Sequence, residues 1–131
     1  MTKIIMSWLP GSTCSEILQQ MSIDYIHPLR SLAMYKCGNI EWFGIPRPFL
    51  QPLREFILVE SGTLVEDRVK NLFTDLQTFI YWGCGAPLAF PNEIMNICKE
   101  SLKRVEIHIN APNDEWEVYH NVQVVQVRFH K

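Results

Sequence analysis

The stretch that decides the expected fold is LAMYKCGNIEWF, residues 32–43. Its two ends, Leu32–Tyr35 and Ile40–Phe43, are apolar and aromatic, as strands are. The segment between them, Lys36–Asn39, contains a glycine and an asparagine and reads as a tight turn. Strands joined by so short a turn run antiparallel, because parallel strands need a longer crossover. The stretch therefore predicts a β-hairpin.

Outward from this hairpin, strands and helices are predicted to alternate. Lys3–Trp8 and Glu55–Glu60 are apolar runs of strand length. A short helix is expected to begin at the capping box Thr13–Glu16. A longer helix is predicted from about Leu64 to Trp82, and another is predicted from Pro91 to about Lys103.

A second hairpin is predicted near the C-terminus. Apolar and polar residues alternate over residues 105–110 and again over 116–119, and residues 111–114 between them are rich in turn formers. Hairpins at both ends of the chain favour an α+β fold in the order β-α-β-β-β-α-α-β-β. We expect one domain over residues 1–131, with a mainly antiparallel sheet of five to six strands and two to three helices on one face. No internal repeat is apparent.

Composition excludes several classes of protein. The 131 residues are 47% hydrophobic and 20% charged, with a net charge of −2 and no basic run that would favour a nucleic-acid partner. No segment resembles a signal peptide or a membrane span, which predicts a cytoplasmic protein without membrane contact. The four cysteines form no C-x-x-C pair, so free thiols are expected and neither a metal nor another cofactor is predicted.

The first candidate site is the loop made of Gly11, Ser12, Thr13, Cys14 and Ser15. It joins a predicted strand to a predicted helix, where free amides and the helix dipole favour anions and lower a thiol pKa. An anion-binding loop, or a nucleophilic Cys14, is one interpretation. The other is ordinary helix capping with an incidental cysteine, because the G-x-x-x-x-G-K-[ST] pattern of a phosphate loop is absent.

The second candidate site is a protein-binding surface. Aromatic residues and arginine dominate interface energetics, and an acidic turn favours a basic partner. The residues predicted to form this surface are Trp42, Phe43, Arg47, Phe49, Asp114, Glu115 and Trp116. The alternative is that the aromatic residues fill the core and the acidic turn is simply solvated.

The sequence carries no catalytic constellation, and this absence favours a non-catalytic protein. We expect a binding module that occupies and neutralises a partner protein, in the manner of an immunity protein, an antitoxin or a phage-encoded inhibitor. The alternative is a small enzyme or a phosphate-binding domain centred on residues 11–15, with Cys14 as its nucleophile.

Overall fold

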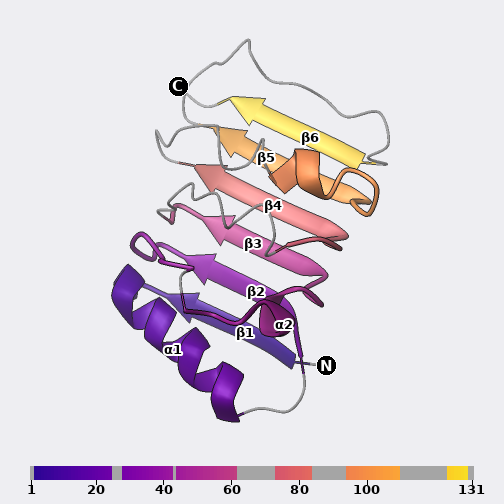
Figure 1. The fold of residues 1–131 in the computed structure, drawn as a ribbon. Helices are drawn as coiled ribbons and strands as arrows, with labels where there is room; N and C mark the ends of the chain where they lie inside the picture. Colours follow the sequence, from indigo (N-terminus) through magenta and orange to yellow (C-terminus); the bar gives the residue numbers. More distant parts are fainter. Residues whose placement is uncertain are drawn as a thin grey trace.

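The computed structural model describes residues 2–24, 28–42, 44–61, 73–83, 94–109 and 124–129, the last range by its backbone alone. Over these residues the chain forms one six-stranded sheet whose spatial order, β1-β2-β3-β4-β5-β6, is also the order of the strands in the chain (Figure 1). The strands are β1 (Thr2–Ser7), β2 (Leu29–Tyr35), β3 (Glu55–Val59), β4 (Thr78–Gly83), β5 (Arg104–Ile109) and β6 (Val124–Phe129). Every neighbouring pair is parallel.

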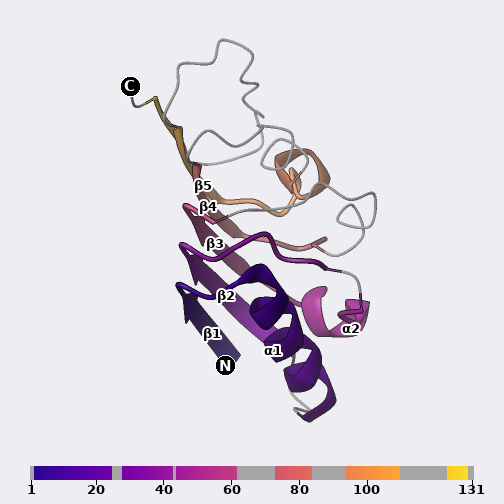
Figure 2. The same ribbon diagram turned by 90° about the vertical axis from the view of Figure 1, so that its left-hand side faces the viewer.

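The described helices all lie on one face of the sheet. Helix α1 (Gly11–Asp24) follows β1, α2 (Arg47–Leu50) follows β2, and a further helical turn at residues 94–97 precedes β5. Figure 2 shows the sheet nearly edge-on, with these helices on its right-hand side. Among the described residues, the opposite face of the sheet carries no helix.

The prediction of a mainly antiparallel sheet is wrong, and the stretch 32–43 shows why. Leu32–Tyr35 is indeed strand, within β2, but β1 occupies one edge of β2 and β3 the other. No edge of β2 is left for Ile40–Phe43. Instead the chain leaves the sheet after Lys36 and enters the helix layer, where Ile40 and Trp42 are buried. Residues 36–39 therefore lead the chain from the end of β2 into the helix layer, instead of turning it back alongside β2.

The second hairpin is wrong for the same reason. The predicted strand at residues 105–109 exists as β5, but β4 and β6 flank it on both sides in parallel. Its proposed antiparallel partner at residues 116–119 lies outside the described residues. The helix predicted from about Leu64 to Trp82 is also wrong over its described part, because residues 73–77 are not helical and residues 78–83 form β4, while residues 64–72 lie outside the described residues.

Other local predictions are confirmed. Lys3–Trp8 corresponds to β1 and Glu55–Glu60 to β3. The helix predicted at the capping box is α1, although it begins at Gly11, so Thr13 lies inside its first turn instead of capping it. The helix predicted from Pro91 to about Lys103 is confirmed only at residues 94–97; residues 98–103 form turns and coil, and residues 91–93 lie outside the described residues.

The stacked strands reveal an internal repeat that the sequence analysis missed. Each unit has the apolar spacing L-x-x-L-x-L, and its first position recurs at intervals of 23 to 26 residues. The first positions are Leu29, Leu53, Leu76 and Leu102. The second are Leu32, Phe56, Phe79 and Val105, and the third are Met34, Leu58, Tyr81 and Ile107. None of these side chains is more than 2% exposed, so each repeat contributes the same three positions to one continuous core.

Candidate functional site: the open face of the sheet

The parallel register lines up the residues of the face without helices, the open face, in three rows across the sheet. Alternate residues of a strand point to opposite faces, so the neighbours of each buried core position belong to the open face. The first row, nearest the strand starts, consists of Lys3, Ser31, Glu55, Thr78 and Arg104. The middle row consists of Ile5, Ala33, Ile57, Ile80 and Glu106. The last row consists of Ser7, Tyr35, Val59, Trp82 and His108.

The middle row is an apolar strip across four strands. Ile5 is 60% exposed, and Ile57 and Ile80 are half-buried. Ala33 is almost fully buried because its small side chain lies between the longer Ile5 and Ile57 on the neighbouring strands. Beside this strip, Trp82 is 37% exposed and stacks on His108, with ring centroids 4.3 Å apart.

At the carboxyl ends of the first three strands lies a row of residues with strained backbone conformations. Trp8, Lys36 and Glu60 directly follow β1, β2 and β3, and all three have positive φ angles, of 59°, 52° and 48°. Their amides donate to the carbonyls of Tyr35, Val59 and Trp82, which extends the sheet by one residue. The Lys36 ammonium lies 4.6 Å from the ring centre of Trp8 and 3.5 Å from the carboxylate of Glu60. Trp8 is 72% exposed.

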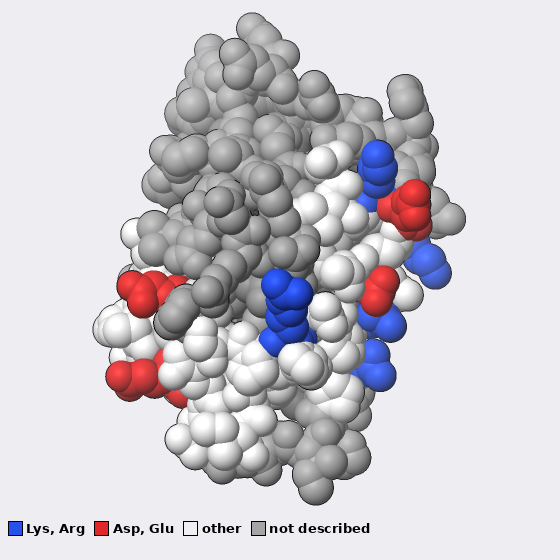
Figure 3. All heavy atoms as spheres, viewed as in Figure 1, with Lys and Arg blue, Asp and Glu red and all other residues white. Residues whose placement is uncertain are grey.

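The opposite end of the sheet is rich in cations. The residues preceding the first row, Arg30, Arg54, Gln77 and Lys103, are also linked by backbone hydrogen bonds of 2.8–2.9 Å, and we call them the amino-terminal rim. Figure 3 has the view of Figure 1, in which the strands begin on the right. Most of the blue side chains visible there lie along the right-hand margin.

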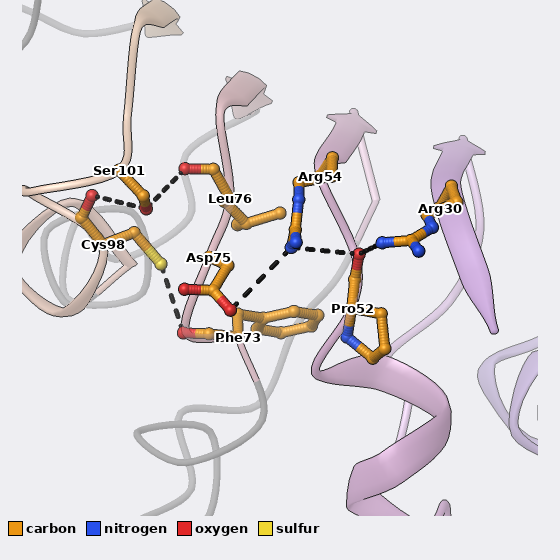
Figure 4. A network of polar contacts seen from close by, with 8 residues as sticks. All are labelled: Arg30, Pro52, Arg54, Phe73, Asp75, Leu76, Cys98 and Ser101. Atoms are coloured by element: carbon orange, nitrogen blue, oxygen red, sulfur yellow. Dashed lines mark hydrogen bonds and ion pairs between the residues drawn. The ribbon is translucent and has the colours of Figure 1, made fainter.

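Two arginines of this rim converge on one acceptor. Arg30 and Arg54 each direct an Nη1 donor at the carbonyl oxygen of Pro52, at 3.2 Å in both cases (Figure 4). The same nitrogen of Arg54 lies 3.8 Å from the carboxylate of Asp75. Beside the arginines is a hollow of about 230 Å³, lined by Arg30, Ser31, Arg54, Glu55, Gln77 and Thr78.

The protein-binding surface expected from the sequence is not brought together in the described residues. Trp42 is 1% and Phe49 7% exposed, so both belong to the core. Trp42 packs edge-on against Phe56 and Phe73, at centroid distances of 5.9 and 5.3 Å. Arg47 is exposed at the start of α2. The remaining members, Phe43, Asp114, Glu115 and Trp116, lie outside the described residues.

The loop expected to bind anions is the first turn of α1, in which the Ser15 hydroxyl and the Cys14 amide form internal hydrogen bonds. Ser12 is exposed, but Gly11, Cys14 and Ser15 are buried. The Ser15 hydroxyl accepts a hydrogen bond from the amide of Glu41 at 3.0 Å, and it lies 2.9 Å from the carbonyl oxygen of the same residue. At Gly11, a Cβ atom would fall 1.6 Å from the carbonyl oxygen of Asn39, so close packing against the chain after β2 explains the glycine.

Cys14 is not arranged as a nucleophile. Its side chain is 0% exposed. Burial, and after it the neighbouring Cys37 thiol, raise the pKa of Cys14 to about 12, so the thiol is neutral near pH 7. The described residues also contain no group of three or more His, Cys, Asp and Glu side chains that could hold a metal ion.

The open face could not be recognised from the sequence, because its residues are unremarkable one by one. Ile5, Ile57 and Ile80 become a surface only when their strands lie side by side in parallel. The available signal was the recurring L-x-x-L-x-L spacing, which marks one face of each strand as core and leaves the intervening residues for the other.

No family model matches the chain, and neither a curated protein nor a solved structure is significantly similar to it. Within the described residues, none of the helices has the length and apolar character needed to cross a membrane.

Proposed function

We propose that this chain is a non-catalytic protein-binding module that uses its open face to occupy, and so neutralise, another protein. One observation carries the proposal. All-parallel sheets are normally covered on both faces, because both faces of their strands are apolar. Here the described helices cover one face, while Ile5, Ile57 and Ile80 form an apolar strip on the other.

The repeat supports this proposal. Units of about 20–29 residues with the spacing L-x-x-L-x-L, each contributing one strand, resemble leucine-rich repeats in pattern. In stacked-repeat proteins each unit contacts only its neighbours, and the sheet presents an extended surface on which other molecules bind. The interval of 23 to 26 residues between successive first positions agrees with this architecture.

The composition of the open face also supports binding to protein. Interfaces combine an apolar, aromatic centre with a polar rim. The middle row and Trp82 provide the centre, while Lys3, Glu55 and Arg104 of the first row provide charged groups beside it. By contrast, the described geometry offers nothing that favours an enzyme centred on residues 11–15.

Affinity capture from lysate of the source organism tests the proposal when the retained proteins are compared among variants. The open-face variant carries Ile5→Glu and Ile57→Thr, which place polar groups in the strip while keeping a β-branched residue in the central strand. The matched control, Arg47→Glu, changes an exposed residue on the helix side. Circular dichroism and thermal unfolding establish that each variant folds.

We expect a protein that is retained by the wild-type chain and by Arg47→Glu, and lost with the open-face variant. Its affinity for the wild-type chain is then measured by calorimetry with both proteins purified. Retention that survives the open-face substitutions, or that disappears only with Arg47→Glu, would show that the open face is not the binding surface. The absence of any specifically retained protein would contradict the proposed function itself.

A further inference from the structure

We infer that the hollow at the amino-terminal rim binds a single carboxylate group, which the partner on the open face supplies from an aspartate, a glutamate or its C-terminus. The hollow is the space of about 230 Å³ between the starts of β2, β3 and β4. The source of the carboxylate rests on the proposed function, whereas the carboxylate site itself rests on the geometry of the hollow.

Arg30 provides the charge that this inference requires. Within the described part of the chain, no carboxylate lies within ion-pair distance of its guanidinium group, which contacts the Pro52 carbonyl. A guanidinium group has five N–H donors in a planar fork that matches a carboxylate. One donor directed at Pro52 leaves the others for a ligand, and the Pro52 contact orients the group beside the hollow (Figure 4).

Arg54 adds a second guanidinium group to the same wall. Besides donating to the Pro52 carbonyl, Arg54 makes a long contact of 3.8 Å with Asp75, whose side chain is 60% exposed. An exposed pair of this kind contributes little stability, so replacing Asp75 by the carboxylate of a ligand costs little. Thr78 and Gln77 contribute a hydroxyl and an amide to the lining, which are neutral donors suited to a carboxylate oxygen.

The size of the hollow and the charge of its lining both favour a carboxylate. A water molecule occupies about 30 Å³ in the liquid, so the space accommodates a carboxylate with part of its side chain. Glu55 also lines the hollow, where it accepts the Ser31 hydroxyl at 2.6 Å and lies 4.0 Å from the Lys3 ammonium. Its negative charge repels a dianion such as phosphate more strongly than a monoanion.

The surroundings of the hollow favour a partner with acidic groups at this end. The cations on the rim and in the first row are Lys3, Arg30, Arg54, Lys103 and Arg104. The acidic groups paired with members of this set are Glu55, Asp75 and Glu106. The excess is positive although the whole chain has a net charge of −2. Complementary charge of this kind steers a partner and fixes its orientation on the adjoining open face.

The test uses the full chain alone, with butyrate as the probe because it has the carboxylate and aliphatic stem of an acidic side chain. The side-chain Nε–H signals of the arginines, assigned from single variants, are followed by nuclear magnetic resonance as sodium butyrate replaces sodium chloride at constant ionic strength. Inorganic phosphate is titrated in parallel. The variant is Arg30→Gln, and Arg47→Gln is the matched control for an exposed arginine outside the hollow.

We expect saturable shifts of the Arg30 and Arg54 signals with butyrate in the wild-type chain and in Arg47→Gln. In Arg30→Gln the Arg54 signal remains as the reporter, and its apparent affinity for butyrate should be weakened about tenfold or lost, as for loss of a charge-assisted contact. Equal shifts of the Arg47 signal would indicate non-specific association of butyrate with exposed arginines and would overturn the inference. Tighter saturation by phosphate would overturn the choice of a carboxylate. Since no partner is present, a negative result here leaves the capture experiment unaffected, and failure of the capture experiment leaves the butyrate result standing.

Discussion

The thiol of Cys14 illustrates how the same residue type changes its chemistry with its surroundings. At an exposed helix start its pKa would fall, because the helix dipole favours the thiolate. In this fold the first turn of α1 is packed against the chain that leaves β2, and burial dominates. The pKa of Cys14 is therefore raised, to about 12, and the group acts as a small apolar core residue.

This raised pKa predicts a specific loss of stability at alkaline pH. The unfolded thiol releases its proton near its ordinary value of 9.0, whereas the folded thiol holds it to about 12. The stabilisation is thus complete below pH 9 and declines as the pH rises from 9 toward 12. The free energy of unfolding, measured with urea at several pH values in this range, should fall more steeply with rising pH for the wild-type chain than for Cys14→Ala.

Among the described residues, Cys98 and Tyr81 are also buried groups with raised pKa values, and because they are present in both proteins their contribution cancels in this comparison. Identical slopes would mean that Cys14 ionises normally in the folded chain. Rapid labelling of native Cys14 by iodoacetamide near neutral pH would lead to the same conclusion and would restore the nucleophile interpretation.

At the scale of the element, β1, β2 and β3 are each followed by one residue with positive φ, and after β1 and β2 the chain then turns into the helix layer. Trp8, Lys36 and Glu60 take the same backbone conformation after three successive strands. L-residues adopt it at a cost of about 1–2 kcal/mol, which the surrounding hydrogen bonds offset. The repeat is therefore maintained by backbone geometry as well as by its apolar spacing.

Substitutions at Lys36 isolate this backbone cost. Lys36→Ala and Lys36→Gly both remove the contacts with Trp8 and Glu60, so their difference reflects conformation alone. We expect the glycine variant to be more stable by about 1 kcal/mol in urea unfolding, because glycine takes a positive φ without strain.

The matched control is Lys3, in the extended strand β1. There the order should reverse, with alanine more stable than glycine by about 0.5–1 kcal/mol. An alanine variant at position 36 as stable as its glycine counterpart would contradict the left-handed conformation after β2.

At the scale of the whole molecule, the core is one-sided. Phe56 packs beneath the sheet with Phe73 and Phe79, at centroid distances of 5.0 and 6.0 Å, in a cluster that also includes Trp42 and Tyr81. Its neighbour in β3, Ile57, belongs to the open face. Two consecutive residues of a central strand thus have different structural roles.

This asymmetry predicts unequal costs for truncating the two side chains. Phe56→Ala should lower the free energy of unfolding by about 3–5 kcal/mol, because it opens a cavity in the core. Ile57→Ala should cost about 1 kcal/mol, because its side chain is half-buried. Urea unfolding of the two variants provides the measurement. Equal costs, or a larger cost at Ile57, would mean that the open face is covered as a second core.

The local elements were largely predictable, and the sites were not. The apolar runs that became β1 and β3 were visible because each has strand length and ends at a polar or glycine-rich segment. Trp42 was expected at an interface and lies in the core, because the segment that follows β2 turns beneath the sheet. Arg30 could not be recognised from the sequence as a residue that lines a hollow, because the hollow is formed together with Arg54 and Thr78 on other segments, and the Pro52 carbonyl that orients Arg30 also lies on another segment.

The sequence by itself determined that β1, β3, β5 and much of β2 are strands, that a helix follows β1, and that the apolar residues suffice for one core. Only the tertiary structure decided that the strands are parallel, that residues 78–83 form a strand, and that Ile5, Ile57 and Ile80 meet on the open face. The physical reason is that side-chain periodicity distinguishes the two faces of a strand but not its direction. Direction depends on backbone hydrogen bonds, which every strand can offer on either edge, and on the path of the chain between strands.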